Sequence, residues 1–256
     1  MMTPRSLLVS GVDPDPVDWV NRDLTSPILL TCEHAGRQIP QRLGDLGLTA
    51  DVIDLHIGWD IGAAAVTRTM ARTLGCPAIL QRYSRLVIDC NRPPDASDAV
   101  PRVTDGVTIP DNADLSHDDH QARVHEIFEP YQQAVTAARG EPRKLLLSVH
   151  SFTPALRSEA GERPWHIGLL CRADTETSIA LQHEISLLRP DLCLALNQPY
   201  QIDDQSDWFV PNHGEASGLP HSLIEIRNDL IHDTDGQTEI ADLLSQAVCN
   251  LLEKTC

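Results

Sequence analysis

The chain has 256 residues, enough for one large α/β domain, and its 41% of hydrophobic residues is that of an ordinary globular protein. A formal net charge of −17 argues against nucleic-acid binding, because such a surface repels phosphates. No apolar run is long enough to span a membrane, and seven cysteines without a CxxC pair favour a reduced, cytoplasmic protein.

Strand and helix patterns alternate along the chain after a lead-in segment over residues 1–26. Short apolar runs bounded by turn residues predict strands; these are residues 27–32, 78–81, 86–90, 144–149, 167–171, 192–196 and 222–226. Apolar stripes at helical spacing predict helices at residues 60–74, 117–139, 175–188 and 239–252. This alternation predicts one domain over residues 1–256, with a mostly parallel sheet covered by helices on both faces.

Residues typical of helix starts and ends support two of these predicted helices. Asp60 is placed to cap helix 60–74 and Gly75 to stop it, and Ser116 and Asp119 have capping-box spacing at the next helix. The aspartates and histidines at that second helix start, including His117, are therefore read as a solvated helix terminus rather than a metal cluster. The long segments 92–115 and 197–219 are expected to be loops, of which the first is functional or mobile.

Charged side chains stand where three apolar strands end. His34 follows strand 27–32, His150 follows strand 144–149, and Glu225 lies within strand 222–226. Buried charge is costly unless it is paired or bound to a metal, and parallel strands gather their ligands at their carboxyl ends. One such histidine alone is more often a satisfied structural residue. Two histidines with an internal acid predict a catalytic metal site, which needs about three N or O ligands.

The third ligand is left open by the sequence. His56 and Asp60 are four residues apart and share a face if their segment is helical. Asp60 is equally a plain helix cap. Glu33 is a weaker candidate than His34, because adjacent residues of a strand face opposite ways.

Glu225 is the predicted general base, since activation of a metal-bound water needs a carboxylate to move its proton. The alternative is a structural pair with Arg227 on the same strand face. Arg85 and Arg92 are predicted to clamp a substrate carboxylate, and the alternative for both is surface salt bridging. Ser151 follows His150, but no nucleophile elbow surrounds it.

Six motifs stand in a characteristic order between residues 29 and 231. They are EHAG (33–36), DLHIGWDIGA (54–63), SRLVIDCNR (84–92), EPY (129–131), VHSFTP (149–154) and IEIRNDLI (224–231). This ordered set resembles the N-formylglutamate amidohydrolase family, and SRLVIDCNR is its most specific piece.

The resemblance implies a three-layer α/β/α fold, phosphorylase/hydrolase-like and similar to zinc carboxypeptidases. It also implies a divalent metal ion, which is expected to be zinc. It implies hydrolysis of N-formyl-L-glutamate to formate and L-glutamate, the last step of one histidine-degradation route. The substrate is then a small molecule bearing a carboxylate. Matched by position, the expected metal ligands are His34, His56, Asp60 and His150, the expected base is Glu225, and the expected substrate-binding residues are Arg85 and Arg92. Arg227 is a further candidate for substrate binding.

Three departures set the chain in a divergent branch. Glu33 stands where family members of the histidine pathway tend to have proline, Gln132 where they tend to have histidine, and Val149 where they tend to have glycine. The substrate therefore stays open, as does the oligomeric state. A carboxypeptidase or aminoacylase acting on another acidic substrate is the alternative enzyme, and a catalytically silent metal-binding protein is the alternative from another class.

Overall fold

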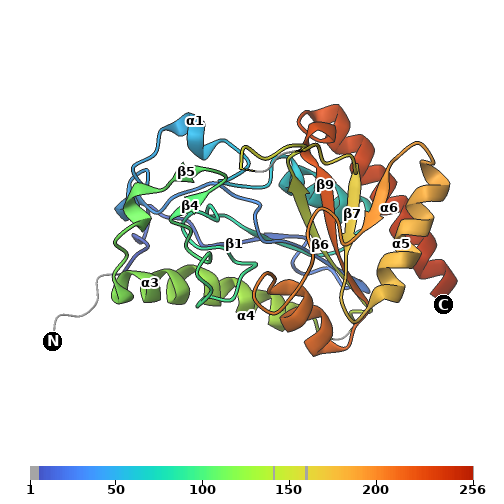
Figure 1. Ribbon diagram of the computed structural model, residues 1–256. Helices are drawn as coiled ribbons and strands as arrows, with labels where there is room; N and C mark the ends of the chain where they lie inside the picture. Colours follow the sequence, from blue (N-terminus) through green and yellow to red (C-terminus); the bar gives the residue numbers. More distant parts are fainter. Residues whose placement is uncertain (1–5, 141, 159–160, 256) are drawn as a thin grey trace.

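A seven-stranded mixed sheet forms the centre of the fold in the computed structural model, which describes residues 6–140, 142–158 and 161–255 (Figure 1). The strand order is β1-β3-β2-β6-β9-β7-β8. Their bounds are β1 Val17–Val20, β2 Ile28–Cys32, β3 Ala78–Gln81, β6 Leu145–Phe152, β7 Ile167–Leu170, β8 Leu194–Leu196 and β9 His221–Arg227. Only the pairs β1–β3 and β7–β9 are antiparallel, so the predicted mostly parallel sheet is confirmed.

Helices cover both faces of the sheet, which confirms the three-layer α/β/α architecture. One face packs against α2 (Ala63–Thr73), α5 (Thr175–Leu188) and α6 (Thr234–Thr255). The opposite face packs against a continuous helical stretch made of α3 (His117–Arg123), the π-helical turn η3 (Val124–Phe128) and α4 (Glu129–Ala138). Successive residues of strand β2 face opposite sides of the sheet. Leu30 packs in the core under α2, α5 and α6, and Leu29 packs in the core under α3, η3 and α4.

Short elements occupy the connections between the longer strands and helices. The expected loop 92–115 contains a small hairpin as well as a 3-10 turn. The remaining elements are η1 Gln41–Leu43, α1 Ala50–Ile53, β4 Val103–Thr104, β5 Val107–Thr108, η2 Pro110–Asn112, η4 Val210–Glu215 and η5 Asn228–Leu230. Within the described residues, no helix is long and apolar enough to cross a membrane.

Two strand predictions were wrong. Residues 17–20, assigned to the lead-in, form the antiparallel edge strand β1, and residues 1–5 of that lead-in lie outside the described part of the chain. Residues 86–90 form turns instead of a strand. The Ser84 hydroxyl accepts the Leu86 amide at 3.1 Å, and the Asp89 carboxylate accepts the Asn91 amide at 2.8 Å. Local bonds of this kind satisfy the backbone without a strand ladder.

The helix starts show one correct and one incorrect prediction. Ser116 caps α3 by accepting the Asp119 amide at 3.1 Å, as its spacing predicted. Asp60 does not cap α2, because that helix begins at Ala63 with Gly62 at its N-cap. Gly62 has φ 83°, and a Cβ there would lie 2.2 Å from the Ile231 carbonyl oxygen. The turn therefore leaves the Asp60 side chain available for other contacts.

The central strands align their carboxyl ends. Strands β2, β6 and β9 are consecutive neighbours in the sheet, and all run parallel. In this register His150 of β6 lies directly opposite Glu225 of β9, and Gly168 of β7 lies opposite Glu225 on the other side. The sheet thus brings together polar residues that are far apart in the sequence.

Gly168 is a position where the fold tolerates no side chain. A Cβ on Gly168 would lie 1.8 Å from the Gln198 carbonyl oxygen. We expect Gly168→Ala to lower the free energy of unfolding in urea by about 1–3 kcal/mol, because the backbone has to shift to relieve the overlap. Gly140→Ala is the control, since a Cβ there meets nothing within 4 Å and is expected to change stability by less than about 0.5 kcal/mol. Equal stability of the two variants would show that Gly168 does not lie in close contact with the Gln198 carbonyl oxygen.

Candidate active site and metal centre

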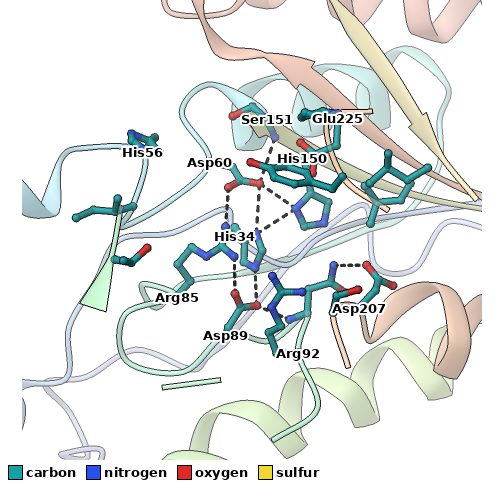
Figure 2. Close-up of a pocket in the computed structure, with 18 of the residues that line it drawn as sticks. His34, His56, Asp60, Arg85, Asp89, Arg92, His150, Ser151, Asp207 and Glu225 are labelled. Atoms are coloured by element: carbon teal, nitrogen blue, oxygen red, sulfur yellow. Dashed lines mark hydrogen bonds and ion pairs between the residues drawn. The ribbon is translucent and has the colours of Figure 1, made fainter. Parts of the chain in front are cut away.

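A cavity of about 460 Å³ opens beside the carboxyl ends of β2, β6 and β9. Figure 2 shows the residues that converge in it. The sequence-predicted residues that line it are His34, His56, Asp60, Arg85, Arg92, His150 and Glu225. Their common location confirms that the polar strand ends meet at one edge of the sheet.

Three side chains meet at the floor of the cavity. His34, Asp60 and His150 are all buried and form the metal-competent group found among the described residues. The Asp60 Oδ2 atom lies 3.3 Å from His34 Nδ1 and 2.9 Å from His150 Nδ1, and the two ring nitrogens are 3.1 Å apart (Figure 2). His34 follows β2, His150 belongs to β6, and Asp60 comes from the turn before α2.

A carboxylate supports the far side of each imidazole. His34 Nε2 lies 2.7 Å from Asp89 Oδ1, and His150 Nε2 lies 2.9 Å from Glu33 Oε2. When each Nε2–H donates to its carboxylate, the two Nδ1 lone pairs face the Asp60 carboxylate. Two lone pairs and an anion facing one another suit a cation at their centre. The N, N, O donor set also leaves a coordination position open, as catalytic metal sites require.

Glu33 has a larger role than its sequence position suggested. The chain leaves β2 at Cys32, so the alternation of a strand no longer applies to Glu33 and His34. Glu33 is 2% exposed, and it accepts hydrogen bonds from the Tyr131 hydroxyl at 3.1 Å and from the Ser148 hydroxyl. Burial opposes ionisation, but the hydrogen bond and charge of His150 lower the pKa of Glu33 to about 2. Glu33 is therefore an ionised carboxylate that orients His150.

Arg85 links the acids around His34. Its guanidinium donates to Asp89 Oδ2 at 2.6 Å and lies 3.6 Å from Asp60 Oδ1. Burial opposes the charge of Asp89, but Arg85 and then His34 lower the pKa of Asp89 well below its usual value. Arg92 also lines the cavity, with its Nε 3.1 Å from Asp98. Arg85 and Arg92, which the sequence predicts to bind a substrate carboxylate, therefore both line the cavity.

Glu225 faces the cavity from the middle of β9. Its side chain is buried, and among the described residues its Oε2 atom has no hydrogen-bond partner. Burial raises the pKa of Glu225 to about 7, with Asp60 adding to the rise and His150 opposing it. A carboxyl group with an unpaired oxygen and a pKa near neutrality is suited to exchanging protons with a ligand in the cavity.

Two expected site residues are not brought to the cluster. His56 lines the rim of the cavity, where its Nε2 lies 3.3 Å from Asp105 Oδ2, and it is outside the group of three. Arg227 does not line the cavity, because its guanidinium turns to Asp229 at 2.7 Å and to the Pro164 carbonyl at 3.3 Å. His56 is close to Asp60 in the sequence, and Arg227 is on the same strand as Glu225. Neither relation brings its side chain to the cluster.

Sequence reasoning missed a buried pair at the cavity wall. The Asn91 side chain donates to Asp207 Oδ2 at 2.7 Å, and its Oδ1 atom accepts the Phe209 amide at 2.8 Å. Burial raises the pKa of Asp207 to about 6, although the Val210 amide and Asn91 oppose the rise. Asn91 belongs to SRLVIDCNR, but nothing in the sequence marked Asp207 as its partner 116 residues away.

Comparison with known proteins gives a consistent result. The family model for N-formylglutamate amidohydrolase matches residues 26–232. The solved structure of the gene product Atu2144 from Agrobacterium tumefaciens is 34% identical, with 94% of this chain and 96% of that chain covered and a TM-score of 0.88. N-formylglutamate amidohydrolase from Ralstonia eutropha JMP134 shares the fold at 18% identity, with 94% and 98% covered and a TM-score of 0.67. No curated protein matches the chain.

Glu33, whose carboxylate pairs with the Nε2 atom of His150, provides a test of the metal centre. Replacing Glu33 by glutamine keeps the size of the side chain but removes the charge that accepts the His150 Nε2–H. We expect the affinity for Zn²⁺, measured by competition with a chromophoric chelator, to fall by about 10–100-fold.

The matched control is Glu129→Gln. Glu129 also pairs with a histidine, His125, at 3.0 Å, but this pair is exposed on the helical layer. Its removal is expected to leave Zn²⁺ affinity unchanged. If Glu33→Gln binds Zn²⁺ as tightly as Glu129→Gln, Glu33 does not support the metal centre.

Proposed function

This chain belongs to the N-formylglutamate amidohydrolase family, and we propose that it is a metal-dependent enzyme that hydrolyses an N-formyl or N-acyl amino acid. The favoured substrate is N-formyl-L-glutamate, which gives formate and L-glutamate. The observation that carries this proposal is the cavity in which a buried, unpaired Glu225 oxygen accompanies the cluster of His34, Asp60 and His150.

The ligands proposed for the metal are His34, Asp60 and His150. Two imidazole nitrogens and one carboxylate oxygen match the ligands that zinc accepts at catalytic sites, so zinc is the proposed ion. When bound, the ion supplies Lewis acidity that polarises the amide carbonyl and makes a water molecule more acidic. Glu33 and Asp89 hold the two rings in the tautomer that leaves each Nδ1 free to coordinate.

Glu225 is the proposed general base. Its carboxylate accepts a proton from the attacking water as the water oxygen bonds to the acyl carbon. It then returns that proton to the amide nitrogen as the C–N bond breaks, so the products are a carboxylic acid and an amine. A pKa near 7 suits both transfers, because the group then gains and loses a proton at similar cost at neutral pH.

Arg85 and Arg92 are the proposed partners of the substrate carboxylate. Guanidinium groups bind carboxylates through paired N–H donors, and both of these line the cavity. Arg85 also contacts Asp89 and lies near Asp60, so a substrate held there would lie next to the metal ligands. Such placement keeps the scissile amide within reach of Glu225.

The cellular setting is a further part of the proposal. All six cysteines in the described part of the chain are free, and two of them, Cys193 and Cys249, are exposed. Free exposed thiols suit a reducing compartment, so we place the reaction in the cytoplasm, in histidine degradation.

Metal dependence is tested by formate release from N-formyl-L-glutamate. We expect no release from protein stripped with a chelator and recovery of release when Zn²⁺ is restored, because the apo protein lacks the group that polarises the carbonyl. Release that is equal before and after chelation would contradict a metal mechanism. If neither form releases formate, a panel of other N-acyl amino acids decides between another substrate of this class and no hydrolysis at all.

The role of Glu225 is tested by Glu225→Gln. We expect kcat to fall by about 10²–10⁴-fold while zinc content stays the same, because glutamine fills the space but cannot carry the proton. The control is Glu184→Gln, which removes another buried glutamate whose partner is Lys254 on the far helical layer. Turnover of Glu225→Gln at the control rate would exclude Glu225 as the base.

A further inference from the structure

The loop over residues 197–207 is held against the sheet next to Glu225. At its start the Asn197 amide donates to the Leu169 carbonyl at 3.0 Å, and the Asn197 side chain accepts the Cys171 amide at 2.9 Å. A Cβ added to Gly168 would lie 1.8 Å from the Gln198 carbonyl oxygen and 3.6 Å from Glu225 Cβ. The loop backbone therefore crosses β7 at the residue that neighbours the proposed base.

The other end of the loop is fixed as well. Asp207 is bound by the Asn91 side chain and by the Val210 amide, both at 2.7 Å. Between these anchors, residues 199–202 line the same cavity as His150 and Glu225. The two anchors thus fix where the backbone of this stretch runs along the cavity, although the Tyr200 side chain itself is 40% exposed.

Tyr200 is the polar group that this loop brings to the cavity with an oriented hydrogen bond. The Arg163 guanidinium donates to the Tyr200 hydroxyl at 2.9 Å and lies 5.0 Å from the centre of its ring. The phenol oxygen is therefore an acceptor toward Arg163. Among the described residues, no acceptor receives the phenolic proton, so that proton is available to a ligand in the cavity.

The phenol stays protonated at neutral pH. Burial and the nearby charge of Glu225 raise the pKa of Tyr200, while Arg163 and Arg85 oppose the rise. The hydroxyl group thus acts as a hydrogen-bond donor and not as a base. The bond from Arg163 polarises it further, since a hydrogen-bonded hydroxyl oxygen makes its own proton a stronger donor.

We propose that Tyr200, oriented by Arg163, donates a hydrogen bond to the acyl oxygen of the substrate at the reacting amide. The inference rests on the proposed amide hydrolysis. As water adds to the acyl carbon, the C=O π pair moves to that oxygen. The same pair re-forms the C=O bond when the C–N bond breaks, so the hydroxyl group stabilises charge without transferring its proton. A fixed donor at such an oxygen acts mainly in the transition state.

The acyl oxygen is preferred over the substrate carboxylate because of where the groups lie. The acyl carbon has to be within reach of Glu225, and the Tyr200 loop crosses the sheet beside Glu225. The carboxylate already has Arg85 and Arg92 as partners of opposite charge. A neutral donor beside the base is best matched to an oxygen that becomes negative during the reaction.

Tyr200→Phe tests the inference through the separate effects on kcat and KM. With the zinc-loaded enzyme and the N-acyl amino acid it hydrolyses fastest, we expect kcat to fall on the order of 10²-fold, and KM and zinc content to stay within about twofold. Unchanged kcat, or a raised KM with normal kcat, would overturn the inference and leave the proposed hydrolysis intact. A wild-type protein that hydrolyses no member of the panel would overturn both.

The matched control removes a phenol oxygen outside the cavity. Tyr83 donates to the Pro14 carbonyl at 2.7 Å and does not line the cavity, so Tyr83→Phe should keep kcat while lowering thermal stability. Loss of kcat in this control equal to that in Tyr200→Phe would assign the effect to stability and overturn the inference.

Arg163 is a positioning residue in this scheme, and a double-mutant cycle tests it. Arg163→Lys should lower kcat in the presence of Tyr200, and should lower it no further in the Tyr200→Phe background, because its effect passes through the phenol. Equal losses in both backgrounds would show that Arg163 acts independently of Tyr200 and would overturn this part of the inference.

Discussion

Negative charge is buried at the carboxyl ends of β2 and β6 and has to be compensated. The rest of the site depends on this constraint. Three carboxylates meet there with almost no exposure to water; they are Glu33, Asp60 and Asp89. An ionised carboxylate is very costly to bury unless it is paired or coordinated. His34 and His150 each place one ring nitrogen on an outer carboxylate and turn the other toward the central one. Arg85 offsets one of these negative charges. The proposed cation, held by His34, Asp60 and His150, would complete the neutralisation, so structural stability and the proposed metal chemistry make the same demand on these residues.

The parts of this site that strand pattern determines were predictable from the sequence. His34 follows an apolar run, and His150 and Glu225 lie near the carboxyl ends of two others, which a parallel sheet has to bring together. Contacts that depend on loop conformation were not predictable. The pattern of residues 86–90 is that of a strand, but the Asp89 carboxylate accepts the Asn91 amide and those residues turn instead. Asp60 was expected to cap α2 but stands two residues before the N-cap, a position that the left-handed Gly62 occupies. In both cases the departure from the sequence pattern places an aspartate, Asp89 or Asp60, in the cavity. Such departures are expected at functional sites, where local structural preference is overridden.

The substrate proposed for this acidic protein is an anion, so the negative charge of the protein has to be offset locally. The chain carries a formal net charge of −17, yet each aspartate that lines the cavity has a hydrogen-bonding or charged partner. Asp89 is paired with Arg85, and Asp207 accepts from Asn91 and has a pKa raised by burial to about 6. The field that a ligand meets is therefore set by nearby guanidinium groups and by the proposed metal ion, not by the overall charge. Low dielectric in the cavity strengthens these near interactions relative to the distant surface.

The rim of the cavity explains what His56 does instead of joining the cluster. The turn of hairpin β4–β5 places Asp105 at φ 44°, where its Oδ1 atom accepts the Ser158 amide at 2.8 Å and the Ser158 hydroxyl at 2.9 Å. Its second oxygen lies 3.3 Å from His56 Nε2. Three segments from distant parts of the chain thus meet at one carboxylate: the hairpin, the loop after β6 and the segment before Asp60. The expected long loop 92–115 is therefore tied to its neighbours at the point where it reaches the cavity. Because the walls are joined by such contacts, the cavity is largely formed before a ligand enters, and less ordering of the protein is left to oppose binding.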